Sequence, residues 1–185
     1  MRRLRFIPAM LMILSACSEN LIEQRPLSSD EVGTVSIALS ADTRNEVIGT
    51  RADADEPLLD DFRVAIYKLE DDKMIRLYND SYANTVGQEI KLNSAMYRLV
   101  AHHGDSLGCG FSKAYYLAEK EFAVKKGHNS VSAEAKLSNV KFAVDYHQSI
   151  RDNYVDYYAI VRHNDFEGKK IKFAKNETRS GYMPG

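Results

Sequence analysis

Three observations predict an all-β fold for this chain of 185 residues. Apolar and polar side chains alternate in about ten short stretches, which is the pattern of half-buried strands. Tyr and Phe are abundant, with 11 and 7 residues, and aromatic and β-branched residues favour strands. The turns between stretches are short and show no helical period, so neighbouring strands should pair antiparallel. We therefore expect an antiparallel β-sandwich of about seven strands, followed by a partial second β-domain.

The first predicted domain covers residues 34–137. Its first strand, at 34–40, alternates strictly and places Val35, Ile37 and Leu39 on one face. The other strands are expected at 62–67, 74–78, 88–92, 96–103, 118–124 and 129–137. The last two form a hairpin, in which Gly127 supplies the residue with positive φ.

The second predicted domain covers residues 138–185. Strands are expected at 139–146, 157–162 and 170–175, with a short helical turn at 148–154. The inward face of the middle strand is open between two sets, Tyr158 with Ile160 or Tyr157 with Ala159 and Val161. So few strands bury little surface, so we expect an incomplete domain. Either it is truncated, or a partner supplies the missing strand.

The N-terminus predicts export and lipid attachment. Residues 1–16 contain three Arg and then an apolar run too short to span a bilayer, which is typical of a signal peptide. The run ends in Leu14, two small residues and Cys17, a pattern that resembles a bacterial lipobox. Acyl chains on Cys17 would hold the protein stably on a membrane. Ser18 follows instead of Asp, which favours the outer membrane, with the cell surface as the expected side and a periplasm-facing position as the alternative.

The mature chain is expected to be mildly acidic and to lack disulfides. Without residues 1–16, 22 basic residues face 26 acidic ones, so no nucleic-acid partner is expected. Acylation of Cys17 would leave Cys109 without a partner. Residues 17–33 are polar and predict a flexible tether. Residues 41–60 lack apolar periodicity and predict an exposed, mobile insertion, in which Arg44 and Arg51 should be the first trypsin sites.

No catalytic, metal or cofactor site is predicted. Adjacent residues of a strand point to opposite faces, so His102 and His103 should not chelate one ion. Cys109 lacks a matching base and orienting group, and no acidic loop has calcium-site spacing. The chain is therefore not expected to be an enzyme. Several Tyr could form a sugar-stacking platform or pack at the edge of the core, namely Tyr115, Tyr116, Tyr154, Tyr157 and Tyr158.

An ordered series of short motifs carries a family resemblance. It is composed of Ala95-x-Tyr97-x-Leu99-x-Ala101-x-x-Gly104-Asp105, Tyr115-Tyr116, Glu121-Phe122-x-Val124-x-x-Gly127, Leu137-x-Asn139-Val140 and Gly181-Tyr182. Together with the lipobox, these motifs resemble the Bacteroidetes lipoproteins of domain-of-unknown-function family 4493, which are more distantly similar to fimbrillin and fimbrial-anchor proteins. Position 95 is Ala where the family usually has Gly.

This resemblance implies a cell-surface lipoprotein with immunoglobulin-like or transthyretin-like β-sandwich domains. It favours a non-enzymatic adhesion or fimbria-like assembly module, with other β-domain proteins as partners through strand addition. The alternative is a carbohydrate- or glycan-binding accessory lipoprotein. Asp105-Ser106-Leu107 resembles an O-glycosylation acceptor of this bacterial group, so Ser106 is a candidate modification site. The relatives are also matured by cleavage at an Arg, which implies the same for Arg44 or Arg51.

Overall fold

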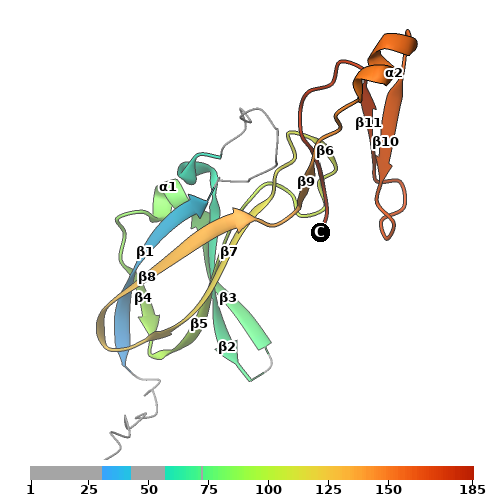
Figure 1. The fold of residues 1–185 in the computed structure, drawn as a ribbon. Coiled ribbons are helices and arrows are strands. Elements are labelled where there is room, and N and C mark those ends of the chain that lie inside the picture. Colours follow the sequence, from blue (N-terminus) through green and yellow to red (C-terminus); the bar gives the residue numbers. More distant parts are fainter. Residues whose placement is uncertain (1–30, 43–56, 72) are drawn as a thin grey trace, which may run out of the picture.

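The computed structural model describes residues 31–42, 57–71 and 73–185 as a curled β-sheet with a smaller C-terminal unit at one end (Figure 1). The strands of the sheet are β1 (Val32–Asp42), β2 (Arg63–Glu70), β3 (Lys73–Ser81), β4 (Ile90–Asn93), β5 (Ala95–His103), β7 (Tyr116–Val124) and β8 (Gly127–Leu137). Two short helices accompany them, η1 (Leu59–Asp61) and α1 (Tyr82–Thr85). The C-terminal unit contains β6 (Gly110–Phe111), β9 (Val140–Phe142), α2 (Gln148–Asn153), β10 (Tyr158–Arg162), β11 (Lys170–Ala174) and β12 (Gly181–Met183).

The seven strands form one mixed sheet in the order β3-β2-β5-β7-β8-β1-β4. β1 runs parallel to β8, from Gly33 beside Gly127 to Asp42 beside Lys136, and antiparallel to β4. The prediction of purely antiparallel pairing is therefore wrong for this pair. Short turns dictate antiparallel pairing only for consecutive strands, and β1 and β8 are far apart in the sequence. The structure also has one continuous sheet here instead of two.

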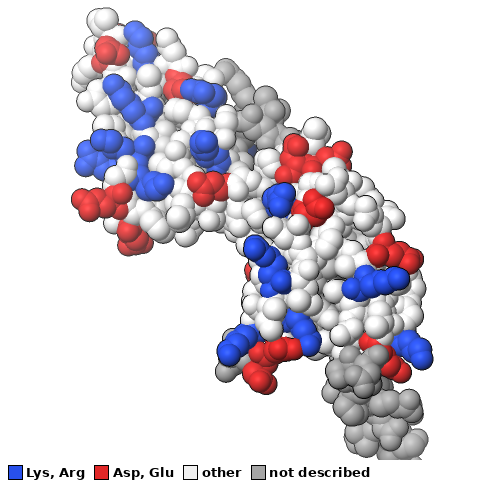
Figure 2. Space-filling view, turned by 180° about the vertical axis from the view of Figure 1, so that it is seen from behind, with Lys and Arg blue, Asp and Glu red and all other residues white. Residues whose placement is uncertain are grey.

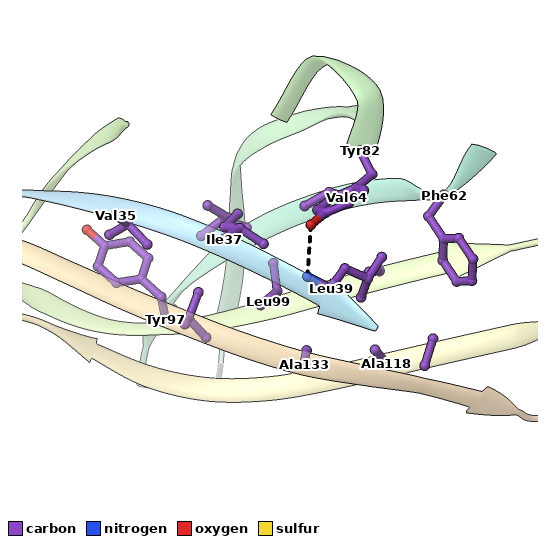
Figure 3. Close-up of a cluster of buried hydrophobic side chains, with 14 of the residues drawn as sticks. Val35, Ile37, Leu39, Phe62, Val64, Tyr82, Tyr97, Leu99, Ala118 and Ala133 are labelled. Carbon is purple, nitrogen blue, oxygen red and sulfur yellow. Dashed lines mark hydrogen bonds between the residues drawn. The ribbon is translucent and has the colours of Figure 1, made fainter. Parts of the chain in front are cut away.

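The sheet curls around a core built from the alternating apolar faces that the sequence predicted (Figure 3). Val35, Ile37 and Leu39 of β1 are all buried. Two small residues, Ala118 and Ala135, are buried near the end where β7 and β8 pair. The opposite end holds Tyr97, which is 1% exposed. The curled sheet is thus narrow near the C-terminal unit and wider at its other end.

Tyr82 joins two parts of the sheet that no backbone ladder connects. β4 pairs with β1 only as far as Val35, and in the described part of the chain no strand lies beside the rest of this edge of β1. Tyr82, the first residue of α1, places its hydroxyl 3.1 Å from the backbone nitrogen of Leu39 and accepts its hydrogen bond (Figure 3). Ser81 caps α1, since its side chain accepts a hydrogen bond from the Asn84 nitrogen at 3.3 Å. The short helix therefore fixes the Tyr82 side chain toward β1.

The predicted strands lie where expected, with ends that differ by a few residues. The largest differences are at 139–146, of which only 140–142 is a strand, and at 17–33, because β1 already begins at Val32. The sequence predictions missed α1, η1, β6 and β12, which are too short to show a period. Gly127 has φ of 94°, as the hairpin requires. Of the predicted insertion at 41–60, residues 43–56 lie outside the described residues.

The C-terminal unit is built around Phe173. It is composed of the three-stranded sheet β6-β12-β9 and the hairpin β10-β11. Phe173 is fully buried, and its ring centroid lies 5.2 Å from that of Phe111 and 5.7 Å from that of Phe142. A Cβ on Gly181 would lie 2.8 Å from Phe173, so only glycine fits in the central strand β12. Ala159 and Val161 pack on this core, which settles the open question about the inward face of β10.

One connection of the large sheet contributes a strand to this unit. β6 lies between β5 and β7 in the sequence, yet it pairs with β12. Asn139 holds the connection in place, because its amide accepts from the Tyr115 nitrogen at 3.1 Å and donates to the Lys113 oxygen at 2.7 Å. Gly104 begins the connection with φ of 89°, which favours glycine. The domain division at residue 138 stays a prediction, and so does the incompleteness of the second domain.

We predict that Tyr82→Phe destabilises the full chain by about 1–2 kcal/mol, because the buried Leu39 N–H loses its acceptor. Urea unfolding followed by circular dichroism measures this difference. Tyr154→Phe is the matched control, since Tyr154 is 62% exposed and should change stability by less than about 0.5 kcal/mol. Equal stability of the two variants would contradict the role given to the Tyr82 hydroxyl.

Candidate interaction surfaces

The curled sheet leaves a groove between its two edge strands. β3 and β4 stand at the two ends of the strand order, and neither outer edge pairs with another strand of the described chain. A groove of about 430 Å³ lies between them, and β2 and β5 contribute to its walls. We call this feature the seam groove. It is lined by Lys68, Glu70, Ile75, Leu77, Lys91, Leu92, Asn93 and Tyr97.

Local sequence explains why the core does not fill the seam groove. The inward face of β2 is apolar at Val64 and Ile66 but becomes polar at Lys68. A β-bulge lies at the same level, since Ile66 faces Tyr78 and Tyr67 faces Arg76, so Leu77 is left without an opposing residue. Bulges bend a strand and can re-aim a side chain, and here the pairing of β2 with β3 resumes beyond the bulge. Leu77 therefore stays 50% exposed on the groove wall.

Two of the charged residues of the seam groove form an ion pair, and a hydrogen bond holds the tyrosine at its floor. Lys68 forms an ion pair with Glu70, and the hydrogen bond from the ammonium group to that carboxylate raises the pKa of Lys68. Tyr97 donates its hydroxyl proton to the Asn93 oxygen at 2.8 Å, and burial raises the pKa of Tyr97. Both groups therefore keep their ordinary charge at neutral pH. The groove offers exposed apolar side chains beside the backbone groups of two strand edges.

A second surface lies on the C-terminal hairpin β10-β11. One face of the hairpin packs on the Phe173 core, and the other is exposed, with Tyr158 at 56% and Ile160 at 41%. A pocket of about 560 Å³ opens at the loop between the two strands, where Arg162 and Lys170 contribute to its lining. We call the outer face and this pocket together the hairpin face.

Three of the four predicted site residues lie outside the described residues, namely Cys17, Arg44 and Arg51. The fourth, Ser106, is exposed in a turn. The Asp105 carboxylate accepts a hydrogen bond from the Leu107 nitrogen at 2.9 Å, and the Asp105 carbonyl accepts one from Gly108 at 2.9 Å. This turn presents the Ser106 side chain to solvent, and its glycosylation stays a prediction.

The structure does not bring the His and Cys residues considered for catalysis or metal binding into one site. His103 lies against Phe62, with 5.6 Å between ring centroids, whereas His102 lies 6.1 Å from Tyr115. Burial lowers the pKa of His102, whose Nδ1 has no hydrogen-bond partner in the described part of the chain. Cys109 packs half-buried against the Phe173 core. Within residues 31–42, 57–71 and 73–185, no three His, Cys, Asp or Glu side chains are grouped to hold a metal ion.

The tyrosines divide between the two roles that the sequence left open. Tyr116 is 4% exposed and belongs to the core of the sheet. Tyr157 is half-buried against Tyr146, with ring centroids 4.7 Å apart. Tyr154 and Tyr158 are exposed at the C-terminal unit. Sequence periodicity could not separate these groups, because the inward face of β10 was not assigned.

Comparison with known proteins identifies the family. The fold is that of a mostly β protein with a curled mixed sheet, and in the described segments no helix is long and apolar enough to cross a membrane. The chain belongs to the family described as "Domain of unknown function (DUF4493)", whose model matches residues 31–185. No curated protein and no solved structure matches the chain significantly.

Proposed function

We propose that the protein is a surface-anchored lipoprotein that acts as a non-enzymatic adhesion or fimbria-like assembly module. The observation that carries this proposal is the seam groove between two unpaired strand edges. An unpaired edge is a template for another strand, and strand addition is a common mode of recognition. The expected partner is another β-domain protein, which inserts one strand.

The lining of the seam groove suits an inserted strand. Backbone groups of β3 and β4 would supply the hydrogen bonds, and Ile75, Leu77 and Leu92 would contact alternate side chains of the incoming strand. Exposed side chains on β3 support this view, since Ile75 and Leu77 are both more than 40% exposed. A long apolar edge of this kind is otherwise a site of aggregation.

The proposal also covers how the protein is attached to the membrane and which proteins it is related to. Cys17 would carry the lipid and place the protein in the outer membrane of a Bacteroidetes bacterium, at the cell surface. The curled sheet, whose two halves enclose one core, would be a variant of an immunoglobulin-like or transthyretin-like sandwich related to fimbrillins. Processing at Arg44 or Arg51 would then act close to β1, the strand that lies next to β4.

We predict that the full chain in mild detergent forms oligomers whose size rises with protein concentration. Leu77→Lys should shift this assembly to roughly tenfold higher concentration, because a charge is placed where an incoming apolar side chain would pack. Chemical cross-linking and analytical ultracentrifugation measure the distribution. Leu58→Lys is the matched control, since Leu58 is 71% exposed and lies outside the seam groove.

Two results would count against assembly through the seam groove. The first is a monomer at every concentration. The second is an equal effect of Leu77→Lys and Leu58→Lys, which would indicate association through general apolar contacts. Both variants should keep the circular dichroism spectrum of the native chain, since both positions are exposed.

We predict that Cys17→Ser abolishes incorporation of a radioactive fatty acid and releases the protein from membranes. Acyl chains contribute roughly 0.8 kcal/mol per buried methylene, so their loss removes the anchor. Cys109→Ser is the control and should keep both label and membrane attachment. Label retained by the Cys17 variant would refute lipidation at this residue.

A second candidate function is glycan binding. The specific observation in its favour is the exposed aromatic ring of Tyr158 on the hairpin face. Tyr rings are apolar bodies with a polar tip, and they are often used where a partner is partly wet. This function would use a different surface from the seam groove, so the two are compatible.

A further inference from the structure

The hairpin face is basic in a chain that is slightly acidic overall. Residues 157–175 contain five Lys and Arg but only two Asp and Glu, whereas the whole chain has a formal net charge of −1. Figure 2 shows Lys and Arg side chains, with some Asp and Glu among them, on the lobe that the C-terminal residues form. Residues 139–185 together contain eight Lys and Arg and six Asp and Glu, so the positive excess of this unit lies in the hairpin.

Strand register places these cations on one face. In the hairpin, Ile160 lies opposite Lys172, and Arg162 lies opposite Lys170. The intervening residues, such as Val161 and Ile171, point to the Phe173 core. Because side chains alternate across a strand, Arg162, Lys170 and Lys172 all lie on the outer face. The sheet pairing thus builds the cluster from two strands.

Two acidic residues elsewhere in the C-terminal unit are paired with other cations. Asp145 forms an ion pair with Arg151. Glu177 pairs with Arg179 at 2.8 Å, and this hydrogen-bonded guanidinium lowers the pKa of Glu177 to about 2. In contrast, no carboxylate of the described residues forms an ion pair with the three cations of the outer face. Their charges are available to a ligand.

The pocket at the β10–β11 loop places a concave site next to these cations. His163 anchors the loop, since its Nδ1 accepts hydrogen bonds from the nitrogens of Asp165 at 3.1 Å and Phe166 at 3.3 Å. Lys169 donates to the Leu107 oxygen at 2.6 Å and ties the loop to the β5–β7 connection. Arg162 and Lys170 line the pocket together with one carboxylate, that of Glu167. The pocket continues the outer face at the end of both strands.

An exposed aromatic ring stands beside the cations. The Lys172 ammonium lies 4.1 Å from the centroid of the Tyr158 ring. This is a cation–π interaction, which contributes about 0.5–1 kcal/mol at exposed sites. A sugar that carries a carboxylate or sulfate presents an apolar ring face and an anion at once. Tyr158 with Lys172, Lys170 and Arg162 matches both features.

The hairpin face is also distant from the predicted anchor. Figure 1 shows that the start of β1 and the hairpin β10-β11 lie at opposite ends of the molecule. A lipid at Cys17 would hold the sheet end near the membrane and present the hairpin face to the medium. This placement favours a ligand in the medium over the headgroups of the membrane that carries the anchor.

We propose that the hairpin face, composed of Tyr158, Arg162, Lys170 and Lys172 with the adjoining loop pocket, binds an acidic polysaccharide. The carboxylate or sulfate groups pair with the three cations, and one sugar ring packs beside Tyr158. This inference deepens the glycan-binding candidate and rests on it. It is independent of strand addition at the seam groove.

The test is a calorimetric titration of the full chain, in mild detergent, with polygalacturonate at low and at high salt. We expect saturable binding that weakens with salt, because the Debye length falls from about 10 Å at 0.1 M to about 3 Å at 1 M. Lys170→Glu should weaken binding about tenfold. Lys126→Glu makes the same charge change in the exposed turn after β7 and should leave the affinity within about twofold.

Further experiments distinguish the contribution of the Tyr158 ring from that of the cations. They also distinguish an acidic polysaccharide from other polyanions. Tyr158→Ser should weaken binding several-fold while leaving the charge unchanged. Polyglutamate, single-stranded DNA, neutral dextran and phosphatidylglycerol vesicles should bind at least about tenfold more weakly. Equal binding of any of these, or equal loss in Lys170→Glu and Lys126→Glu, would overturn the proposal. Assembly through the seam groove would be unaffected by that result, since Leu77 lies in the other part of the molecule.

Discussion

The hydrogen bond between the Tyr82 hydroxyl and the Leu39 nitrogen holds α1 against the part of the β1 edge that β4 does not cover. β1 pairs with β8 over ten residues but with β4 over only four. The rest of its free edge faces α1, and Tyr82 supplies an acceptor there. An unsatisfied buried N–H costs about 1–3 kcal/mol, so this contact matters to a protein of ordinary stability. It fixes the distance between β1 and the end of β3.

The position of the seam groove follows from this contact. The chain passes from β3 through α1 to β4, so the two edge strands are connected at the Tyr82 end and separate away from it. Tyr97 and Leu92 form the floor where the core ends, and the bulge leaves Leu77 of β3 without an opposing residue on β2. The C-terminal unit lies at the narrow end and leaves the groove open. Two surfaces of different chemistry are thus kept apart.

Alternation in the sequence was sufficient to predict the strands and most of the core. Val35, Ile37 and Leu39 are buried as their pattern indicated, because a half-buried strand needs one apolar face. It could not predict the parallel partner of β1, since long-range pairing leaves no local signal. The contribution of β6 to the second sheet was missed for the same reason. β6 is only two residues long, so its sequence can show no periodicity. The Asn139 contacts that hold the β5–β7 connection join segments about 25 residues apart.

The candidate surfaces were less predictable than the fold. The sequence identified exposed Tyr as an alternative, but only the register of β10 with β11 shows that Tyr158, Arg162 and Lys172 share a face. The seam groove depends on a bulge and on two edges that meet through curvature, neither of which a linear pattern contains. The predicted sites at Cys17, Arg44 and Arg51 rest on sequence signals alone.

The central claim is that the outer edges of β3 and β4 are unpaired in the monomer and become paired on assembly. Amide hydrogen exchange of the full chain, read by mass spectrometry of peptides covering β3, β4 and the central strand β5, tests it directly. At high dilution we expect the edge amides of β3 and β4 to exchange at least about a hundredfold faster than those of β5. Protection of β3 and β4 should then rise with concentration while that of β5 stays constant. Edge amides already as protected as β5 in the dilute chain would contradict the account.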